Sequence, residues 1–151
     1  MIISNDYTWD HIVTISGDLT PEAYEQAQLY GILGYLPDFL LDSCMKSKEV
    51  YTVTHNDTPV ALCGVTWTQE YVGDFLWLVV TQSAINNYRE FSRTCKEWLS
   101  GREYPVVSVI PAMSQRTLRM VLKWGFKPTG EAMRDGITHV VLTKYPERGA
   151  K

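Results

Sequence analysis

The sequence predicts one α/β domain of the mixed α+β type, in which a mixed β-sheet carries helices on both faces. Its length of 151 residues is that of a single compact domain. Strand-like runs of β-branched and apolar residues alternate with helix-like segments, and the connections between them are short. In the second half, strand–helix–strand passages imply some parallel pairing. We expect residues 1–151 to form one domain with a frayed tail over residues 146–151.

The N-terminal third is expected to hold one strand and two helices. Residues 11–16 (HIVTIS) alternate and are β-branched, which is typical of a strand. A helix is predicted over residues 21–30, because Thr20 can cap its first turn and Pro21 suits the first helical position. A second helix is predicted from Pro37 to about Lys46.

Three strands are predicted in the middle of the chain. Segments 50–55 and 60–68 are joined by Asn56-Asp57-Thr58-Pro59, a run of turn formers, which indicates a hairpin. The run 74–81 (DFLWLVVT) is almost continuously apolar, as expected for a central strand that is covered on both faces.

The last third is expected to hold two helices and three strands. The first helix covers residues 88–100, with apolar residues on one face and basic residues on the other. A buried strand over residues 105–110 and a helix over residues 114–124 follow. A hairpin over residues 127–145 turns around Asp135-Gly136. The predicted order is therefore β-α-α-β-β-β-α-β-α-β-β.

Charge is divided unevenly along the chain. Residues 1–88 carry eleven acidic and two basic side chains, a balance of −9, whereas residues 89–151 carry twelve basic and six acidic ones, a balance of +6. A basic second half predicts an anionic ligand there, with a solvated charged surface as the alternative. The net charge of −3 disfavours nucleic-acid binding. Nucleic-acid binding nevertheless remains one alternative function. It would use two basic helix faces, with Arg89, Arg93 and Lys96 on one and Arg116, Arg119 and Lys123 on the other.

Features that the sequence lacks argue against other classes of protein. No run reaches 18 apolar residues and the first residues do not form a secretory signal, so we expect no membrane span and no export. Cysteines and histidines are scattered without ligand or disulfide spacing, which predicts reduced thiols, a cytoplasmic location and no metal site. These residues are Cys44, Cys63, Cys95, His11, His55 and His139.

The most specific stretch is residues 105–126, PVVSVIPAMSQRTLRMVLKWGF, a strand, a short loop and an amphipathic helix that closes on Gly125-Phe126. Gly125 suits a left-handed turn after the helix, and Phe126 can then bury against the sheet. With the element order of nearly the whole chain, this stretch resembles the GNAT acyltransferase superfamily, whose members transfer acetyl groups from acetyl-CoA to amines. The Trp-rich strand 75–81 leading into a basic helix is most similar to a small phage group that includes the GNAT-like internal virion protein of T7-like podoviruses.

The resemblance implies acetyl-CoA as the ligand, with its pantetheine arm along the central strand and its phosphates at the loop that follows. The family loop has Gln or Arg, two residues, Gly, one residue, then Gly or Ala; Gln82 fits, but Ile85 and Asn87 occupy the small positions. The implied loop is therefore degenerate, and a fully paired strand with an ordinary turn is the alternative. The implied ligand residues are Val79, Val80, Thr81, Ser83, Ala84, Asn86, Asn87 and Arg89.

Catalytic residues of the family are partly missing. Its frequent tyrosine on the last helix aligns with Val121, which cannot transfer a proton, and the central strand has no Glu. Tyr71 and Tyr88 flank the region and are substitute candidates. Ser114 aligns with the family's Asn and is the third candidate, with a plain helix cap as its alternative.

Besides nucleic-acid binding, two functions remain open at the level of sequence. One is an acetyl-CoA-dependent N-acetyltransferase that acts on an amine substrate. The other is a non-catalytic GNAT-like protein that acts in virion assembly or binds a phage or host protein, in the host cytoplasm or in the virion. Exposed aromatic residues would anchor such a partner, with core packing as the alternative, favoured for Trp67. The candidates are Trp9, Tyr30, Tyr35, Trp67 and Tyr71.

Overall fold

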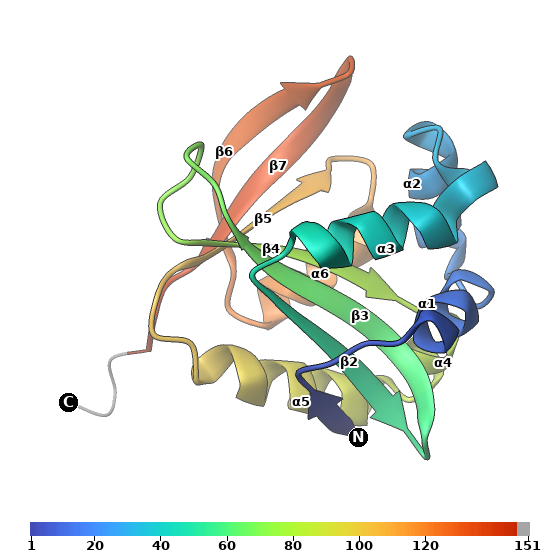
Figure 1. The fold of residues 1–151 in the computed structure, drawn as a ribbon. Helices are drawn as coiled ribbons and strands as arrows, with labels where there is room; N and C mark the ends of the chain where they lie inside the picture. The colour runs from blue at the N-terminus through green and yellow to red at the C-terminus, as the bar shows by residue number, and fades with distance from the viewer. Residues whose placement is uncertain (148–151) are drawn as a thin grey trace.

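Seven strands form one mixed sheet in the order β1-β2-β3-β4-β5-β7-β6 (Figure 1). The structure, a computed structural model, describes residues 1–147. Strand β4 pairs with β5 in parallel, and the other neighbouring pairs are antiparallel. The mixed α/β class is therefore confirmed. The strands are β1 (Ile2–Ser4), β2 (Glu49–His55), β3 (Thr58–Trp67), β4 (Asp74–Val80), β5 (Val106–Pro111), β6 (Lys127–Arg134) and β7 (Ile137–Lys144).

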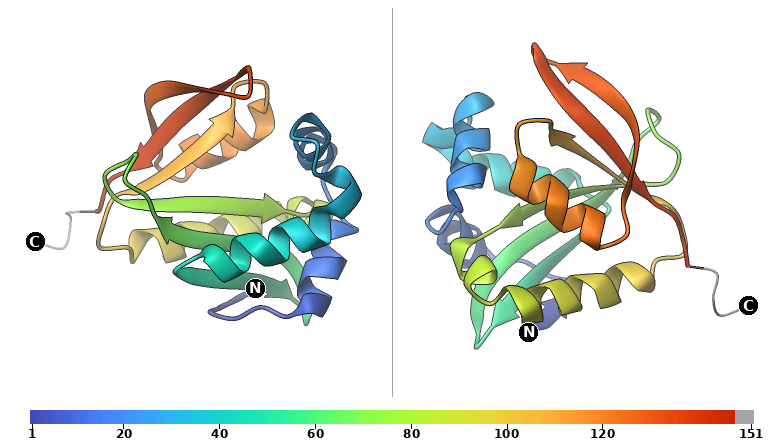
Figure 2. Two further views of the ribbon diagram at one scale, coloured as in Figure 1. Left: turned by 45° about the horizontal axis from the view of Figure 1, so that its top comes forward. Right: turned by 180° about the vertical axis from the view of Figure 1, so that it is seen from behind.

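Helices cover both faces of the sheet (Figure 2). Ile12 and Ile15 of the first helix and Leu40 of the third share one buried cluster with β2 and β3. Phe91 and Val121, from the two long helices of the second half, lie in the larger cluster on the opposite face. The helices are α1 (Trp9–Ser16), α2 (Pro21–Leu29), η1 (a 3₁₀ turn, Leu33–Tyr35), α3 (Leu36–Lys46), α4 (Gln82–Asn86), α5 (Tyr88–Ser100) and α6 (Gln115–Lys123).

The predicted strand over residues 11–16 is wrong, because this segment belongs to helix α1. Thr8 caps the helix, since its Oγ1 accepts a hydrogen bond from the His11 amide at 3.1 Å. Ile12 and Ile15, three residues apart, are fully buried against the sheet. The sequence HIVTIS fits both periodicities, and the cap together with this burial selects the helix. The order thus opens with the short strand β1 and three helices, and it also includes the short helix α4.

Most turn and cap signals of the sequence are confirmed; the exception is Ser114, which precedes α6 but makes no side-chain cap hydrogen bond to it. Thr20 Oγ1 accepts a hydrogen bond from the Ala23 amide, and α2 begins at the following proline. Asn56 and Asp57 adopt positive φ angles of 50° and 65° in the β2–β3 hairpin. Gly125 has φ 101°, and Phe126 after it is 2% exposed, as predicted for the end of α6.

The three cysteines are buried free thiols. Burial raises the pKa of the Cys44 thiol to about 11 and those of Cys63 and Cys95 to about 12. The thiols therefore stay protonated at neutral pH and are poor nucleophiles.

In residues 1–147 no helix combines the length and the apolar composition that crossing a membrane requires. Within the same residues, no three His, Cys, Asp or Glu side chains come together as a metal site. Of the predicted frayed tail, Pro146 and Glu147 lie outside helices and strands, and residues 148–151 lie outside the described part of the chain.

Candidate functional site

Strands β4 and β5 separate after a short paired stretch (Figure 2). Their ladder consists of Asp74 with Val106 and Phe75 with Val107. Just beyond it, the Ser108 hydroxyl donates a hydrogen bond of 2.9 Å to the Leu76 carbonyl. From there on, β4 pairs with β3 and β5 pairs with β7, so a V-shaped gap opens toward the carboxyl ends of both strands.

The main chain of β4 presents polar groups to this gap. The Asp74 amide bonds the Pro105 carbonyl on the β5 side, and the Thr81 amide bonds the Val60 carbonyl of β3. Because successive residues of a strand bond to opposite sides, the main chain of Leu78 and Val80 is directed into the gap. That of Val79 and Thr81 is directed to β3 instead.

Two cavities adjoin the gap and share the lining residues Thr20, Val80 and Thr117. The first, of about 270 Å³, lies between α4, α5 and α6, and we call it the basic cavity. The second, of about 340 Å³, lies between α2, α3 and β4, and we call it the apolar cavity. Val80, whose main chain faces the gap, thus stands where the two cavities meet.

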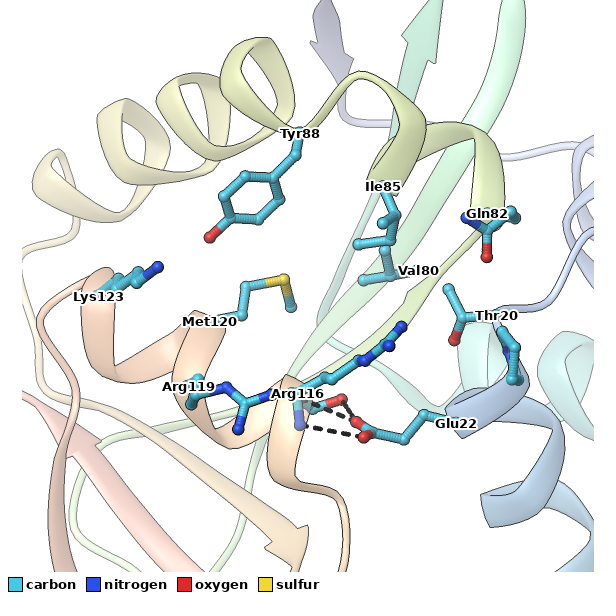
Figure 3. A pocket seen from close by; sticks show the side chains of 12 residues that line it. Thr20, Glu22, Val80, Gln82, Ile85, Tyr88, Arg116, Arg119, Met120 and Lys123 are labelled. Atoms are coloured by element: carbon cyan, nitrogen blue, oxygen red, sulfur yellow. Dashed lines mark hydrogen bonds between the residues drawn. The ribbon is translucent and has the colours of Figure 1, made fainter.

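Three cations of α6 line the basic cavity: Arg116, Arg119 and Lys123 (Figure 3). Within residues 1–147 none of them forms a salt bridge, and Glu22 is the carboxylate that lines the same cavity. Tyr88 lines the cavity from α5. The excess of positive charge makes this cavity a place for an anionic group. Arg89, next to Tyr88, is not among the lining residues.

The first amides of α4 are already bonded within the chain. The Gln82 amide donates to the Asp18 carbonyl at 2.8 Å, and the Ser83 amide donates to the Asp18 carboxylate at 3.2 Å. The Ala84 amide donates to Thr81 Oγ1 at 3.2 Å, and both of these residues are fully buried. The predicted phosphate loop is therefore a capped strand-to-helix turn in this structure.

Side chains of the same loop are also engaged. The Gln82 side-chain amide donates to Asn86 Oδ1, and the Asn87 side-chain amide donates to the Ser83 carbonyl, each at 3.0 Å. Ile85 lines the basic cavity. The turn thus presents an apolar side chain where the family loop has glycine.

Helix α2 crosses the opening of the gap and is held by polar contacts at four-residue spacing. The Glu22 carboxylate accepts hydrogen bonds from the amides of Arg116 and Thr117, at 3.0 and 2.8 Å, and thereby caps α6 (Figure 3). Gln26 Nε2 donates to Ser114 Oγ at 2.7 Å. One turn later, Tyr30 contacts β7. Ala27 is the one buried residue of α2, so little apolar packing holds this helix. The polar contacts therefore set its position.

The three catalytic candidates lie in different places. Tyr88 lines the basic cavity. Ser114 is 1% exposed and holds Gln26, so it is a structural contact of α2. Tyr71 stacks on Phe75 and accepts a hydrogen bond from Arg134 at 3.2 Å, beside a separate surface hollow. Of the three candidates, Tyr88 alone lines one of the two cavities, the basic one.

Sequence reasoning missed the polar stripe of α2 as part of the site. Glu22, Gln26 and Tyr30 are spaced at i, i+4 and i+8, which places them on one helix face. That spacing could have singled them out. Their partners on α6, before α6 and on β7 are more than 85 residues away in the chain, as the bond separations of 88 to 109 residues show.

Removal of the Glu22 carboxylate is expected to loosen α2 without unfolding the protein. In Glu22→Ala two amides of α6 lose their acceptor, which costs about 1 kcal/mol. Amide exchange measured by mass spectrometry should therefore accelerate about fivefold across α2 and the first turn of α6. Glu25→Ala, at an exposed position of the same helix, is the control and should leave both rates unchanged. Equal rates in the two variants would contradict the assigned contact.

Comparison of the sequence with models of protein families and with curated proteins finds no match. Solved structures do match. A GNAT-family acetyltransferase from Streptococcus agalactiae superposes with TM-score 0.75 at 10% identity, over 97% of this chain and 96% of that one. A GNAT-family acetyltransferase from Bacillus cereus does so with TM-score 0.68 at 12% identity, over 97% and 98%.

A third match is an aminoglycoside 6'-N-acetyltransferase in complex with coenzyme A, with TM-score 0.68 and 13% identity, over 98% of this chain and 99% of that one. At these identities the likeness concerns the fold. The separated strands β4 and β5, the helices on both faces and the matched lengths lead to one conclusion: this chain has the fold of the GNAT acetyltransferases.

Proposed function

We propose that the protein is an N-acyltransferase that takes its acyl group from acetyl-CoA. The observation that carries this proposal is the gap between β4 and β5, into which Leu78 and Val80 direct main-chain groups, with a basic cavity at one side and an apolar cavity at the other. A long ligand with an anionic end and an amide-bearing arm suits this arrangement.

The residues present fit such a ligand in a specific way. Since the first amides of α4 are bonded to Asp18 and Thr81, the phosphates would be held by side chains of α6 rather than by that turn. Arg116, Arg119 and Lys123 line the basic cavity and form no salt bridge among residues 1–147, so they can bind phosphate oxygens. The main chain of Leu78 and Val80 would orient the arm, and the apolar cavity would receive the amine and exclude water from it.

Acetyl-CoA binding by calorimetry tests the proposal. Wild-type protein is expected to bind, and the double variant Arg119→Ala/Lys123→Ala should bind at least about tenfold more weakly, because two charge-assisted contacts are lost. Asp18→Asn should change the dissociation constant by less than about twofold, because α4 amides do not hold the phosphates in this proposal.

Lys46→Ala is the matched control for loss of a cation, since Lys46 lies on α3 and pairs with Asp42 at the surface. It should bind acetyl-CoA as the wild type does. Absence of any heat at millimolar acetyl-CoA would overturn the proposal. Unchanged affinity in the double variant, with tighter binding in Asp18→Asn, would move the phosphates to α4.

A second candidate function is a non-catalytic, protein-binding role, in a phage virion or on a host protein in the host cytoplasm. It is supported by exposed aromatic side chains. Trp67 is 66% exposed, so the core packing that the sequence favours for it is wrong. Trp9 and Tyr35 are 47% and 51% exposed. A pull-down from infected and uninfected host lysate with wild type and Trp67→Ser tests this role. A stoichiometric partner lost in the variant would support it, and no partner in either lysate would count against it.

A further inference from the structure

A buried histidine is hydrogen-bonded to a tyrosine that lines the apolar cavity. His139 on β7 is 2% exposed. Its Nδ1 lies 2.9 Å from the Ile137 carbonyl, and its Nε2 lies 2.8 Å from the Tyr30 hydroxyl. A carbonyl only accepts, so the ring proton sits on Nδ1 and the Nε2 lone pair accepts from Tyr30. The backbone thus sets the tautomer in which His139 is a base toward Tyr30.

Tyr30 connects this base to the gap. It lines the apolar cavity together with Leu78 and Val80 of β4, and 39% of its surface is exposed. The two rings are nearly parallel, with an interplanar angle of 6° and centroids 6.0 Å apart. The phenol oxygen can therefore accept a proton from a molecule in the cavity while its own proton points at His139.

Charged groups around the pair are few. Burial raises the pKa of the Tyr30 hydroxyl, Arg134 lowers it and Asp135 raises it, with burial as the largest cause. Both charged residues belong to the β6–β7 hairpin. On the same face of α2, Gln26 does not titrate, and the Glu22 carboxylate is bonded to the first amides of α6. Tyr30 therefore stays a neutral phenol at physiological pH, which a relay requires.

Other cavity-lining groups are poorly placed to take a proton. The Glu22 carboxylate accepts two amides of α6. Asp18 lines neither cavity, and its carboxylate accepts an amide of α4. Arg116, Arg119 and Lys123 are cations. Tyr88 lines the other cavity, and no imidazole is bonded to it within residues 1–147. An imidazole is the side chain whose ordinary pKa, about 6.5, allows it to accept a proton at neutral pH.

We propose that Tyr30 and His139 form the proton relay that deprotonates the attacking amine. This inference rests on the proposed function. The substrate ammonium gives one proton to the Tyr30 oxygen as the Tyr30 hydroxyl proton passes to His139 Nε2. The neutral amine then forms a C–N bond with the thioester carbonyl carbon, and the C–S bond breaks.

The protons balance in this scheme. Of the three protons of the ammonium group, one ends on the Tyr30 oxygen and replaces the hydroxyl proton that moved to His139, one passes to the departing thiolate sulfur and one remains on the amide nitrogen. His139 afterwards releases its proton to solvent through Tyr30. Tyr30 is thus the catalytic residue that touches the substrate, and His139 acts through it.

Steady-state kinetics of Tyr30→Phe and His139→Gln provide the first test, with a panel of primary amines as probes. We expect kcat to fall about 100-fold in each variant, with KM for acetyl-CoA within about twofold of the wild-type value. The rise of kcat with pH that reports the base in the wild type should disappear in both variants. Tyr24→Phe, on an exposed position of the same helix, is the control and should retain the wild-type profile.

A second readout does not depend on turnover. In the free protein, ¹⁵N chemical shifts of His139 should show a protonated Nδ1 and an unprotonated Nε2. Tyr30→Phe removes the hydroxyl that is bonded to Nε2, so the ¹⁵N chemical shift of Nε2 should change while Nδ1 stays protonated. An unchanged Nε2 chemical shift in Tyr30→Phe, or the opposite tautomer, would overturn the relay even if the variants lose activity.

The outcomes separate the relay from the proposed function. Acetyl-CoA binding and amine turnover that persist at wild-type rates in Tyr30→Phe would overturn the relay and leave the acyltransferase function standing. Failure of the wild-type protein to bind acetyl-CoA or to acetylate any amine would overturn both.

Discussion

Gly64→Ala is expected to lower the free energy of unfolding by about 3 kcal/mol. Gly64 of β3 pairs directly with Trp77 of β4. A Cβ atom at this position would lie 2.2 Å from Trp77 Nε1 and 2.3 Å from Cε2, so the indole would have to move. That movement would also break the hydrogen bond of 2.8 Å from Trp77 Nε1 to Ser47 Oγ.

Urea unfolding measures this loss of stability. Because Trp77 lines the apolar cavity, a displaced indole in the same variant should also change the shape of that cavity. Gly34→Ala is the matched control: no atom lies within 4 Å of the added Cβ, and φ at this position is not positive. Its stability should stay within about 0.5 kcal/mol of the wild type. Equal unfolding midpoints for the two variants would show that the Trp77 indole does not pack against Gly64.

Arg102→Met should be similarly destabilising, by about 3 kcal/mol at pH 7. Arg102 donates two hydrogen bonds of 3.1 Å to the Glu49 carboxylate and one of 3.1 Å to Asp74. The side chains of Arg102 and Asp74 are only 16% and 10% exposed. Loss of the guanidinium leaves two carboxylates near the closed end of the gap, with Lys48 as the remaining cation.

The stability lost in Arg102→Met should depend on pH in a defined direction. Hydrogen bonds from Arg102 lower the pKa of Glu49 from 4.5 to about 2. A lowered carboxyl pKa stabilises the fold above its unfolded value, and that stabilisation is lost as pH falls toward the folded value. The difference in stability between wild type and Arg102→Met should therefore narrow between about pH 5 and pH 2.

Urea unfolding of both proteins at several pH values checks this expectation. Lys46→Ala breaks the exposed pair with Asp42 and is the control, expected to cost less than about 0.5 kcal/mol. A difference between wild type and Arg102→Met that is constant from pH 7 to pH 2 would contradict the role assigned to the Glu49 pair.

Local signals predicted much of this fold. The Asn56-Asp57 and Asp135-Gly136 turns, the Thr20 cap and the Gly125-Phe126 ending each act within a few residues of the chain, and each stands where the sequence placed it. The strand predicted for residues 11–16 was wrong because the apolar residues of this segment fit both a strand and a helix. Burial of Ile12 and Ile15 on one helix face decided between the two.

The charge division along the chain also acquires a structural meaning. Its basic half places Arg116, Arg119 and Lys123 at the cavity beside the gap. Its acidic half supplies Asp18 and Glu22, whose carboxylates cap α4 and α6. Composition could not reveal these caps, because they join elements that are 65 and about 94 residues apart.

By itself, then, the sequence determined the kind and approximate bounds of most elements, the mixed sheet and the departure of residues 82–87 from a glycine-rich loop. It did not determine the helix over residues 11–16 or the short elements β1 and α4. Tertiary structure alone decided that β4 and β5 separate after two residue pairs, that α2 spans their opening and that Tyr30 meets His139. Caps and turns depend on neighbours in the chain, whereas the gap and its contacts depend on how distant segments pack, and no short pattern encodes that.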